Sequence, residues 1–170
     1  MTAGTHILAG ILVATLLKLP VLPAAVGSIF PDIDVGKGLP PPYKRNLLNS
    51  HRGITHHPVI PLCLLLLVFF LRMKGFYGVS VYLLSFTVGY ISHLLLDVLN
   101  PLGIPYKFSY YPRLTLKLMK TGKLGEIFVI LLLISTLLAA VGVEDFQILG
   151  FSFDGKLVHW IKNLVEEVRR

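Results

Sequence analysis

Apolar stretches alternate with polar connections along this chain, and this alternation most constrains how it can fold. The apolar stretches are residues 7–17, 24–30, 59–71, 79–99 and 127–143. The fourth is about long enough to cross a bilayer as a helix, which takes roughly 20 residues. The pattern predicts an all-α fold: a polytopic membrane helical bundle of about five short hydrophobic segments.

The first two apolar stretches are separated by Pro20 and Pro23. Two prolines this close usually end a helix. We therefore expect a helical hairpin with arms at residues 5–19 and 21–31. One long, kinked helix is the alternative. The first arm would span about 22 Å, short of a hydrocarbon core of about 30 Å.

Composition agrees with a membrane protein. Hydrophobic residues make up 54% of the 170 residues and charged residues 15%, against about 25% charged in soluble domains. The net charge is +7, but the charges are scattered between apolar blocks, which favours cytoplasmic loops and anionic lipid over nucleic acid. The single cysteine, Cys63, excludes a disulfide within the chain and a thiolate zinc site. A cleaved signal peptide is not expected, because no basic segment precedes the first apolar run.

Two regions are expected along the chain: a membrane-embedded domain with a metal site over residues 1–143, and a tail over residues 144–170. The tail is predicted to contain an amphipathic helix, which Asp154 would cap. Its apolar positions fall on one helical face: Leu157, Ile161, Leu164, Val165 and Val168.

A hairpin at the N-terminus would bring eight histidine and carboxylate side chains to the same membrane face. These are His6, Asp32, Asp34, His51, His56, His93, Asp97 and Glu126. Taken alone, an acid at a helix end is often only a cap. The convergence of all eight is what favours metal binding, since ionisable groups beside a membrane are costly.

The spacing of these residues suits metal ligands. His93 and Asp97 are four apart and project from one helical face. Asp32 and Asp34, if extended, would point to the same side, and Gly53 would permit a tight turn between His51 and His56. Imidazole and carboxylate ligands without thiolate suit Zn, which we favour, or Mn or Fe. Eight candidates exceed what one ion needs, so two or three divalent ions are expected.

Two arginines are candidates for binding substrate. Arg52 and Arg113 can hold an anionic group through bidentate hydrogen bonds, or they can anchor lipid headgroups. Arg52 lies between two proposed ligands, so we expect its guanidinium to point away from the metal. His57 is expected to be an interfacial polar residue, because adjacent side chains point in different directions. Lys117, Lys120 and Lys123 are expected to form a lipid-facing charge run.

Several motifs occur in the order of a known family. They are His6, Phe-Pro-Asp-Ile-Asp at 30–34, His-Arg-Gly-Ile-Thr-His at 51–56, Gly-Tyr-Ile-Ser-His-Leu-Leu-Leu-Asp at 89–97, and Glu126. From residue 4 to about residue 130 the chain resembles the membrane-bound metal-dependent hydrolases, also known as LexA-binding, inner-membrane-associated hydrolases. It departs from their pattern at His57, where relatives have a small residue such as Ser. The resemblance implies a metal site built on these motifs.

The leading functional hypothesis is a metal-dependent hydrolase at the inner membrane, cleaving a phosphoester of a lipid or another membrane-associated substrate. Arg52 and Arg113 would suit a phosphoryl group. The expected partners are the lipid bilayer and a lipid or phosphorylated substrate, with no nucleic acid. A transporter or sensor that binds metal as cargo, and a non-catalytic membrane scaffold, are the alternatives. The loops on the metal face carry nine of the sixteen Lys and Arg residues, which predicts that this face is cytoplasmic.

Overall fold

The computed structural model describes residues 1–141, 147–148, 151–152 and 163. Its five α-helices are α1 (Ala3–Leu16), α2 (Val21–Ile29), α3 (Val59–Met73), α4 (Tyr77–Val98) and α5 (Leu124–Val141). Three short 3₁₀ helices are η1 (Phe30–Lys37), η2 (Pro42–Lys44) and η3 (Ile54–His56). The predicted all-α class is confirmed. The predicted amphipathic helix of the tail, with Asp154 as its cap, lies outside the described residues.

Among the described residues, strands are limited to two small antiparallel pairs. β1 (Ile104–Pro105) pairs with β2 (Arg113–Leu114), with Ile104 opposite Leu114. β3 (Gln147–Ile148) pairs with β4 (Phe151–Ser152). The first pair closes the polar connection between α4 and α5, so it lies at the end of the bundle where α4 finishes.

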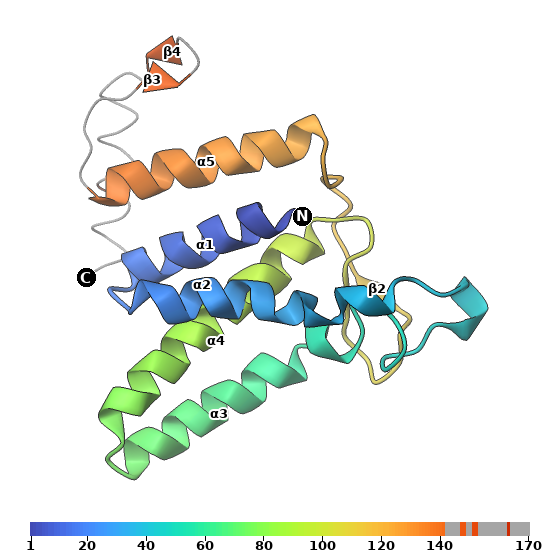
Figure 1. Cartoon of the computed structure of the whole chain (residues 1–170), viewed down its shortest axis with the longest axis horizontal. Coiled ribbons are helices and arrows are strands. Elements are labelled where there is room, and N and C mark those ends of the chain that lie inside the picture. Colours follow the sequence, from blue (N-terminus) through green and yellow to red (C-terminus); the bar gives the residue numbers. More distant parts are fainter. Residues whose placement is uncertain (142–146, 149–150, 153–162, 164–170) are drawn as a thin grey trace.

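The N-terminal hairpin is present. α1 ends at Leu16, the chain turns through Lys18 in the left-handed region (φ 53°), and α2 returns beside α1 (Figure 1). A side chain at Gly10 would collide with Ser28, because the two arms approach closely there. The hairpin prediction is therefore confirmed, and one long kinked helix is excluded.

α4 is the central helix of the bundle. It contacts α1, α2 and α3, while α5 packs on the outer side of α1 (Figure 1). The backbones of α2 and α4 touch: a Cβ at Gly89 would overlap the Ala24 carbonyl oxygen, and a Cβ at Gly27 would overlap the Phe86 carbonyl oxygen. Small residues at such crossings are typical of helices that pack within membranes, where close van der Waals contact drives association.

The distribution of polar and apolar side chains fits a lipid environment. The largest fully buried side chains are mostly polar, among them His6, His56, His93 and Asp97. Large apolar side chains on α3 and α5 face outward, such as Leu66, Phe69 and Phe128. Exposed apolar surface on this scale marks an interaction with membrane or protein.

Helix length qualifies the membrane prediction. Of the described helices, only α4 and α5 are long and apolar enough to cross a membrane by themselves. α1 and α3 are apolar but shorter, and α2 has nine residues. The five predicted segments are thus present as helices, but five full-length spans are not.

Candidate metal centre

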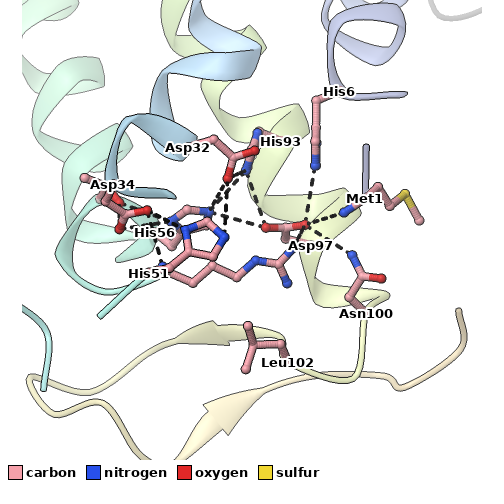
Figure 2. A network of polar contacts seen from close by, with 12 residues as sticks. Met1, His6, Asp32, Asp34, His51, His56, His93, Asp97, Asn100 and Leu102 are labelled. Atoms are coloured by element: carbon pink, nitrogen blue, oxygen red, sulfur yellow. Dashed lines mark hydrogen bonds and ion pairs between the residues drawn. The ribbon is translucent and has the colours of Figure 1, made fainter. Parts of the chain in front are cut away.

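Three segments contribute to a cluster of four possible metal ligands. Asp32 lies in η1, His56 in η3, and His93 and Asp97 one turn apart in α4. One ligand atom from each residue lies within 4.8 Å of the other three. Figure 2 shows the side chains pointing toward one another at the end of the bundle. We call Asp32, His56, His93 and Asp97 the four-residue cluster.

Five of the six distances between the ligand atoms of the cluster are close to those of a tetrahedral site, and the sixth, between Asp32 and Asp97, is within 4.8 Å. The Nε2 atoms of His56 and His93 are 3.2 Å apart, and each is 3.4 Å from Oδ2 of Asp97. Oδ1 of Asp32 lies 3.5 Å from Nε2 of His56 and 3.6 Å from Nε2 of His93. Ligands about 2.0–2.2 Å from a zinc ion at tetrahedral angles are separated by roughly 3.3–3.6 Å. The residues present therefore fit a single divalent ion.

The hydrogen bonds around the two histidines fix which ring nitrogen faces the cluster. Nδ1 of His93 donates to the Ser28 carbonyl (2.6 Å), which leaves a lone pair on Nε2. The Thr55 hydroxyl donates to Asp34 (2.6 Å) and so accepts from Nδ1 of His56 (3.1 Å). Metal-bound histidines are oriented by partners of this kind.

Four acceptors consequently face one another. Both Nε2 atoms carry lone pairs, Oδ2 of Asp97 is buried without a hydrogen-bond donor, and Oδ1 of Asp32 completes the group. Burial lowers the pKa of His56, but the carboxylates of Asp32 and Asp97 outweigh it and raise that pKa. The cluster thus attracts positive charge, either a proton or a metal ion.

Asp34 has another role in this structure. Its Oδ1 accepts from Nδ1 of His51 (2.7 Å) and its Oδ2 from Thr55. The backbone amides of Arg52 and Gly53 also donate to it. Burial raises the pKa of Asp34, but the hydrogen bonds from His51 and Thr55 lower it to about 2. Asp34 therefore holds the 51–55 loop against η1, and the structure does not bring it into the four-residue cluster.

The two aspartates separate because their segment is not extended. The expected extended stretch at 32–34 is wrong: these residues lie in the 3₁₀ helix η1. At three residues per turn, positions two apart point in different directions. Asp32 therefore reaches the cluster and Asp34 reaches the loop. The turn between His51 and His56 also differs from the prediction, because the residue with left-handed backbone is Arg52 (φ 57°) and not Gly53. Gly53 is required for a different reason: a Cβ at this position would overlap the Leu47 carbonyl oxygen.

The remaining three candidates are not part of the cluster. Nε2 of His51 is 3.9 Å from Asp32. The His6 ring stacks on His93 at 3.7 Å, and its Nε2 lies 3.4 Å from Oδ1 of Asp97. Glu126 accepts from the Thr5 hydroxyl (2.8 Å) and the Gly122 amide (2.6 Å). Glu126 thus ties the start of α5 to the start of α1, while His6 and His51 border the cluster.

Arg52 does not point away from the ligands as expected. Its guanidinium donates to Oδ1 of Asp97 (2.7 Å), where Nδ2 of Asn100 also donates (3.3 Å). Oδ1 is therefore held by donors, while Oδ2 of the same carboxylate faces the two histidines. The left-handed backbone at Arg52 is strained for a residue with a side chain. The bonds from its amide and its guanidinium offset that strain.

Arg113 acts on the backbone. Its guanidinium donates to the carbonyls of Leu102 (2.6 Å), Gly103 (2.8 Å) and Arg52 (3.2 Å), and it lies over the Tyr110 ring at 4.3 Å. These contacts join the 102–103 turn to the 51–55 loop. Arg113 is therefore a positioning residue in this structure, and its contact with substrate stays a prediction.

The family model for the YdjM inner membrane protein matches residues 1–153. The chain belongs to this family. The match covers all five helices and every residue of the four-residue cluster. The predicted membrane-associated family and inner-membrane location are thereby confirmed, whereas hydrolysis and LexA binding stay predictions. No curated protein and no solved structure matches the chain.

The YdjM fold supplies partners that sequence reasoning missed. The Ser28 carbonyl that orients His93 is a backbone group, so no residue type signals it. Tyr90, one turn before His93, donates its hydroxyl to the Thr55 carbonyl. The aromatic residue within Gly-Tyr-Ile-Ser-His was the available signal, because a buried tyrosine hydroxyl generally requires a partner.

His56 and His57 provide a direct test of the cluster. His57 is buried away from it: its ring stacks on Phe108 at 4.9 Å, and its Nδ1 accepts from the Val59 amide. His57 is therefore covered by an aromatic ring, and its position at the membrane interface stays a prediction. We expect His57→Ser to keep metal content and most activity, and His56→Ser to lose both. Elemental analysis of the two purified variants measures this, and the reverse result would show that the motif register is wrong.

Proposed function

We propose that this YdjM-family chain is a membrane-bound metal-dependent hydrolase that cleaves a phosphoester of a lipid or another membrane-associated substrate. The observation that supports the proposal most is the four-residue cluster, in which two imidazole nitrogens and two carboxylate oxygens face one another. Zn is the favoured ion, given imidazole and carboxylate ligands at near-tetrahedral spacing. His6 and His51 at the border are candidate ligands for a second or third ion.

The chemistry that such an ion supplies is activation of water and polarisation of a phosphoryl oxygen. The residues of this chain would serve it in three ways. The Asp34 carboxylate orients His51, so that Nε2 of His51 faces Asp32 at the open side of the cluster. Arg52 holds one oxygen of Asp97 and leaves the other for the ion. Asp32, 28% exposed, marks the side from which substrate would enter.

Transport of metal as cargo is less well supported by the arrangement. Ions in transporters are usually bound near the bilayer midplane by interrupted helices. Here the cluster lies at the ends of α2 and α4, next to the polar connections. A position at one membrane face suits a reaction on a headgroup better than passage through the bilayer.

The proposal includes a topology. All five helices would cross or enter the bilayer, with the metal centre at the cytoplasmic face, where nine of the sixteen Lys and Arg residues lie. α1, α3 and α5 start at that face and α2 and α4 end there, so the C-terminus would lie outside the cytoplasm. We expect a C-terminal fusion to a periplasmic reporter enzyme to be active. Activity only from a cytoplasmic reporter would contradict this topology.

The hydrolase proposal is tested on purified protein in detergent. Elemental analysis gives the metal content, and turnover is measured with a chromogenic phosphoester and with phospholipid vesicles. We expect bound divalent metal, turnover that a chelator abolishes, and recovery when Zn²⁺ is added back. Protein that retains its metal but cleaves neither class of phosphoester would refute the hydrolase proposal and favour a sensor or scaffold.

A further inference from the structure

A pocket with both polar and apolar lining residues opens beside the metal centre, with a volume of about 370 Å³. Its floor contains Arg52 and Asn100, both buried, and its rim contains His51, Lys120 and Thr121. Figure 2 shows Asn100 and Leu102, which also border this pocket, on the side of Asp97 away from His93. A volume above about 300 Å³ is sufficient for a small ligand.

The side chains that line this pocket carry positive and no negative charge. Neither an aspartate nor a glutamate lines it. Nε of Arg52 is buried without a hydrogen-bond partner. Lys120 is exposed, and its ammonium has no ion pair or hydrogen bond among the residues that the structure describes. The pocket therefore offers an unpaired cation beside a site that would itself hold a cation.

Lys120 is held near the centre by its backbone neighbours. The amide of Leu116 donates to the Val98 carbonyl (2.8 Å), and the amide of Met119 donates to the Leu99 carbonyl (3.1 Å). These bonds fix the segment before Lys120 against the end of α4. On its other side, the Thr121 hydroxyl lies 3.5 Å from Oδ1 of Asn100. Of Lys117, Lys120 and Lys123, only Lys120 lines this pocket.

We propose that this pocket binds the anionic phosphoryl group of the substrate and that Lys120 is its main charged ligand. The inference rests on the proposed hydrolase function and names the substrate-binding residue of that site. A phosphoryl group here would receive charge-assisted hydrogen bonds from Lys120. It would lie between Lys120 and His51, which lines the pocket and borders the cluster at Asp32.

The phosphoryl group can come from a lipid or from a soluble ester. The chain around Lys120 carries exposed leucines, Leu116, Leu118 and Leu124. Lysines alternating with leucines suit the boundary between headgroups and acyl chains. This arrangement places the pocket mouth at the lipid surface, so the test includes both sources.

The test compares Lys120→Gln with Lys117→Gln, a matched loss of one positive charge in the same segment but outside the pocket. Binding of inorganic phosphate to the zinc-loaded protein is measured by calorimetry. Steady-state kinetics are measured with a soluble phosphoester and with phospholipid vesicles. Loss of one charge-assisted hydrogen bond is expected to weaken phosphate binding and raise KM about tenfold in Lys120→Gln. Metal content is expected to stay unchanged, kcat to change less than KM, and Lys117→Gln to match wild type with the soluble ester.

Each outcome decides a separate question. Equal phosphate affinity in Lys120→Gln and wild type would overturn the pocket assignment. An effect on vesicles alone, of equal size in both variants, would also overturn it and indicate general attraction to anionic lipid. If Lys120→Gln raises KM with both the soluble ester and the vesicles, the pocket binds a phosphoryl group from either source. If Lys120→Gln raises KM only with vesicles, and Lys117→Gln does not, the substrate is a lipid. Phosphate binding is measured without turnover. If the affinity for phosphate depends on Lys120 but neither ester is hydrolysed, the hydrolase proposal is rejected, whereas the assignment of the pocket as an anion-binding site is retained.

Discussion

His93→Ala and Asp97→Ala are each expected to remove most of the bound metal and all measurable hydrolysis. Both residues lie one turn apart on α4 and are fully buried, so they are preorganised toward the other ligands. Loss of an outer partner of a metal ligand costs about 10–100-fold in affinity. Loss of the ligand itself is expected to exceed that range. Elemental analysis after equilibration with a zinc buffer measures the effect.

The control for this experiment is His6→Ala. His6 stacks on His93 and lies near Oδ1 of Asp97, the oxygen that Arg52 and Asn100 also contact. It is on the first helix, near the chain terminus, where fraying is common. We expect a smaller loss of metal in His6→Ala than in the two α4 variants. Unchanged metal stoichiometry in both α4 variants would refute the four-residue cluster as a metal site.

Gly89→Ala is expected to destabilise the protein strongly. The added methyl group would overlap the Ala24 carbonyl oxygen, and a backbone atom cannot move aside as a flexible side chain can. Overpacking typically costs 1–3 kcal/mol and sometimes more, and we expect about 3 kcal/mol or failure to fold. Separation of α2 from α4 would also break the bond between His93 and Ser28. The thermal unfolding midpoint in detergent, together with metal content, measures both effects.

Gly78→Ala is the matched control. Gly78 lies on the same helix, is exposed, and has nothing within 4 Å of an added Cβ. Replacing an exposed helical glycine by alanine stabilises by roughly 0.5–1 kcal/mol. The two variants should therefore shift the midpoint in opposite directions. Equal midpoints would mean that α2 and α4 are not in backbone contact.

Local patterns in the sequence were sufficient for much of this fold. The two prolines after Lys18 predicted the hairpin, and helical spacing placed His93 and Asp97 on one face. Both inferences depend on a few neighbouring residues and on regular helix geometry. The closeness of α2 and α4 was not anticipated, because it depends on Gly27 and Gly89 meeting backbone atoms far away in the sequence.

The different roles of the individual residues within the site were harder to predict. Asp32 and Asp34 have the same side chain, and only the 3₁₀ conformation of η1 sends one to the cluster and the other to the loop. The partner of Arg52 likewise depends on its left-handed backbone, which residue type did not signal. Loop conformation is determined by tertiary contacts, whereas the sequence pattern reports mainly on regular helices and strands.

The unequal helix lengths have a consequence for the surrounding lipid. α2 has 9 residues and α4 has 22, which correspond to about 14 Å and about 33 Å, against a hydrocarbon core of about 30 Å. Both helices end at the metal centre. In the proposed orientation, the whole difference in their lengths therefore lies in the leaflet opposite the metal centre. A short apolar segment thins the bilayer beside it. Lipids of that leaflet next to the Lys18 turn would therefore be compressed, and the protein would be better accommodated by short-chain lipids.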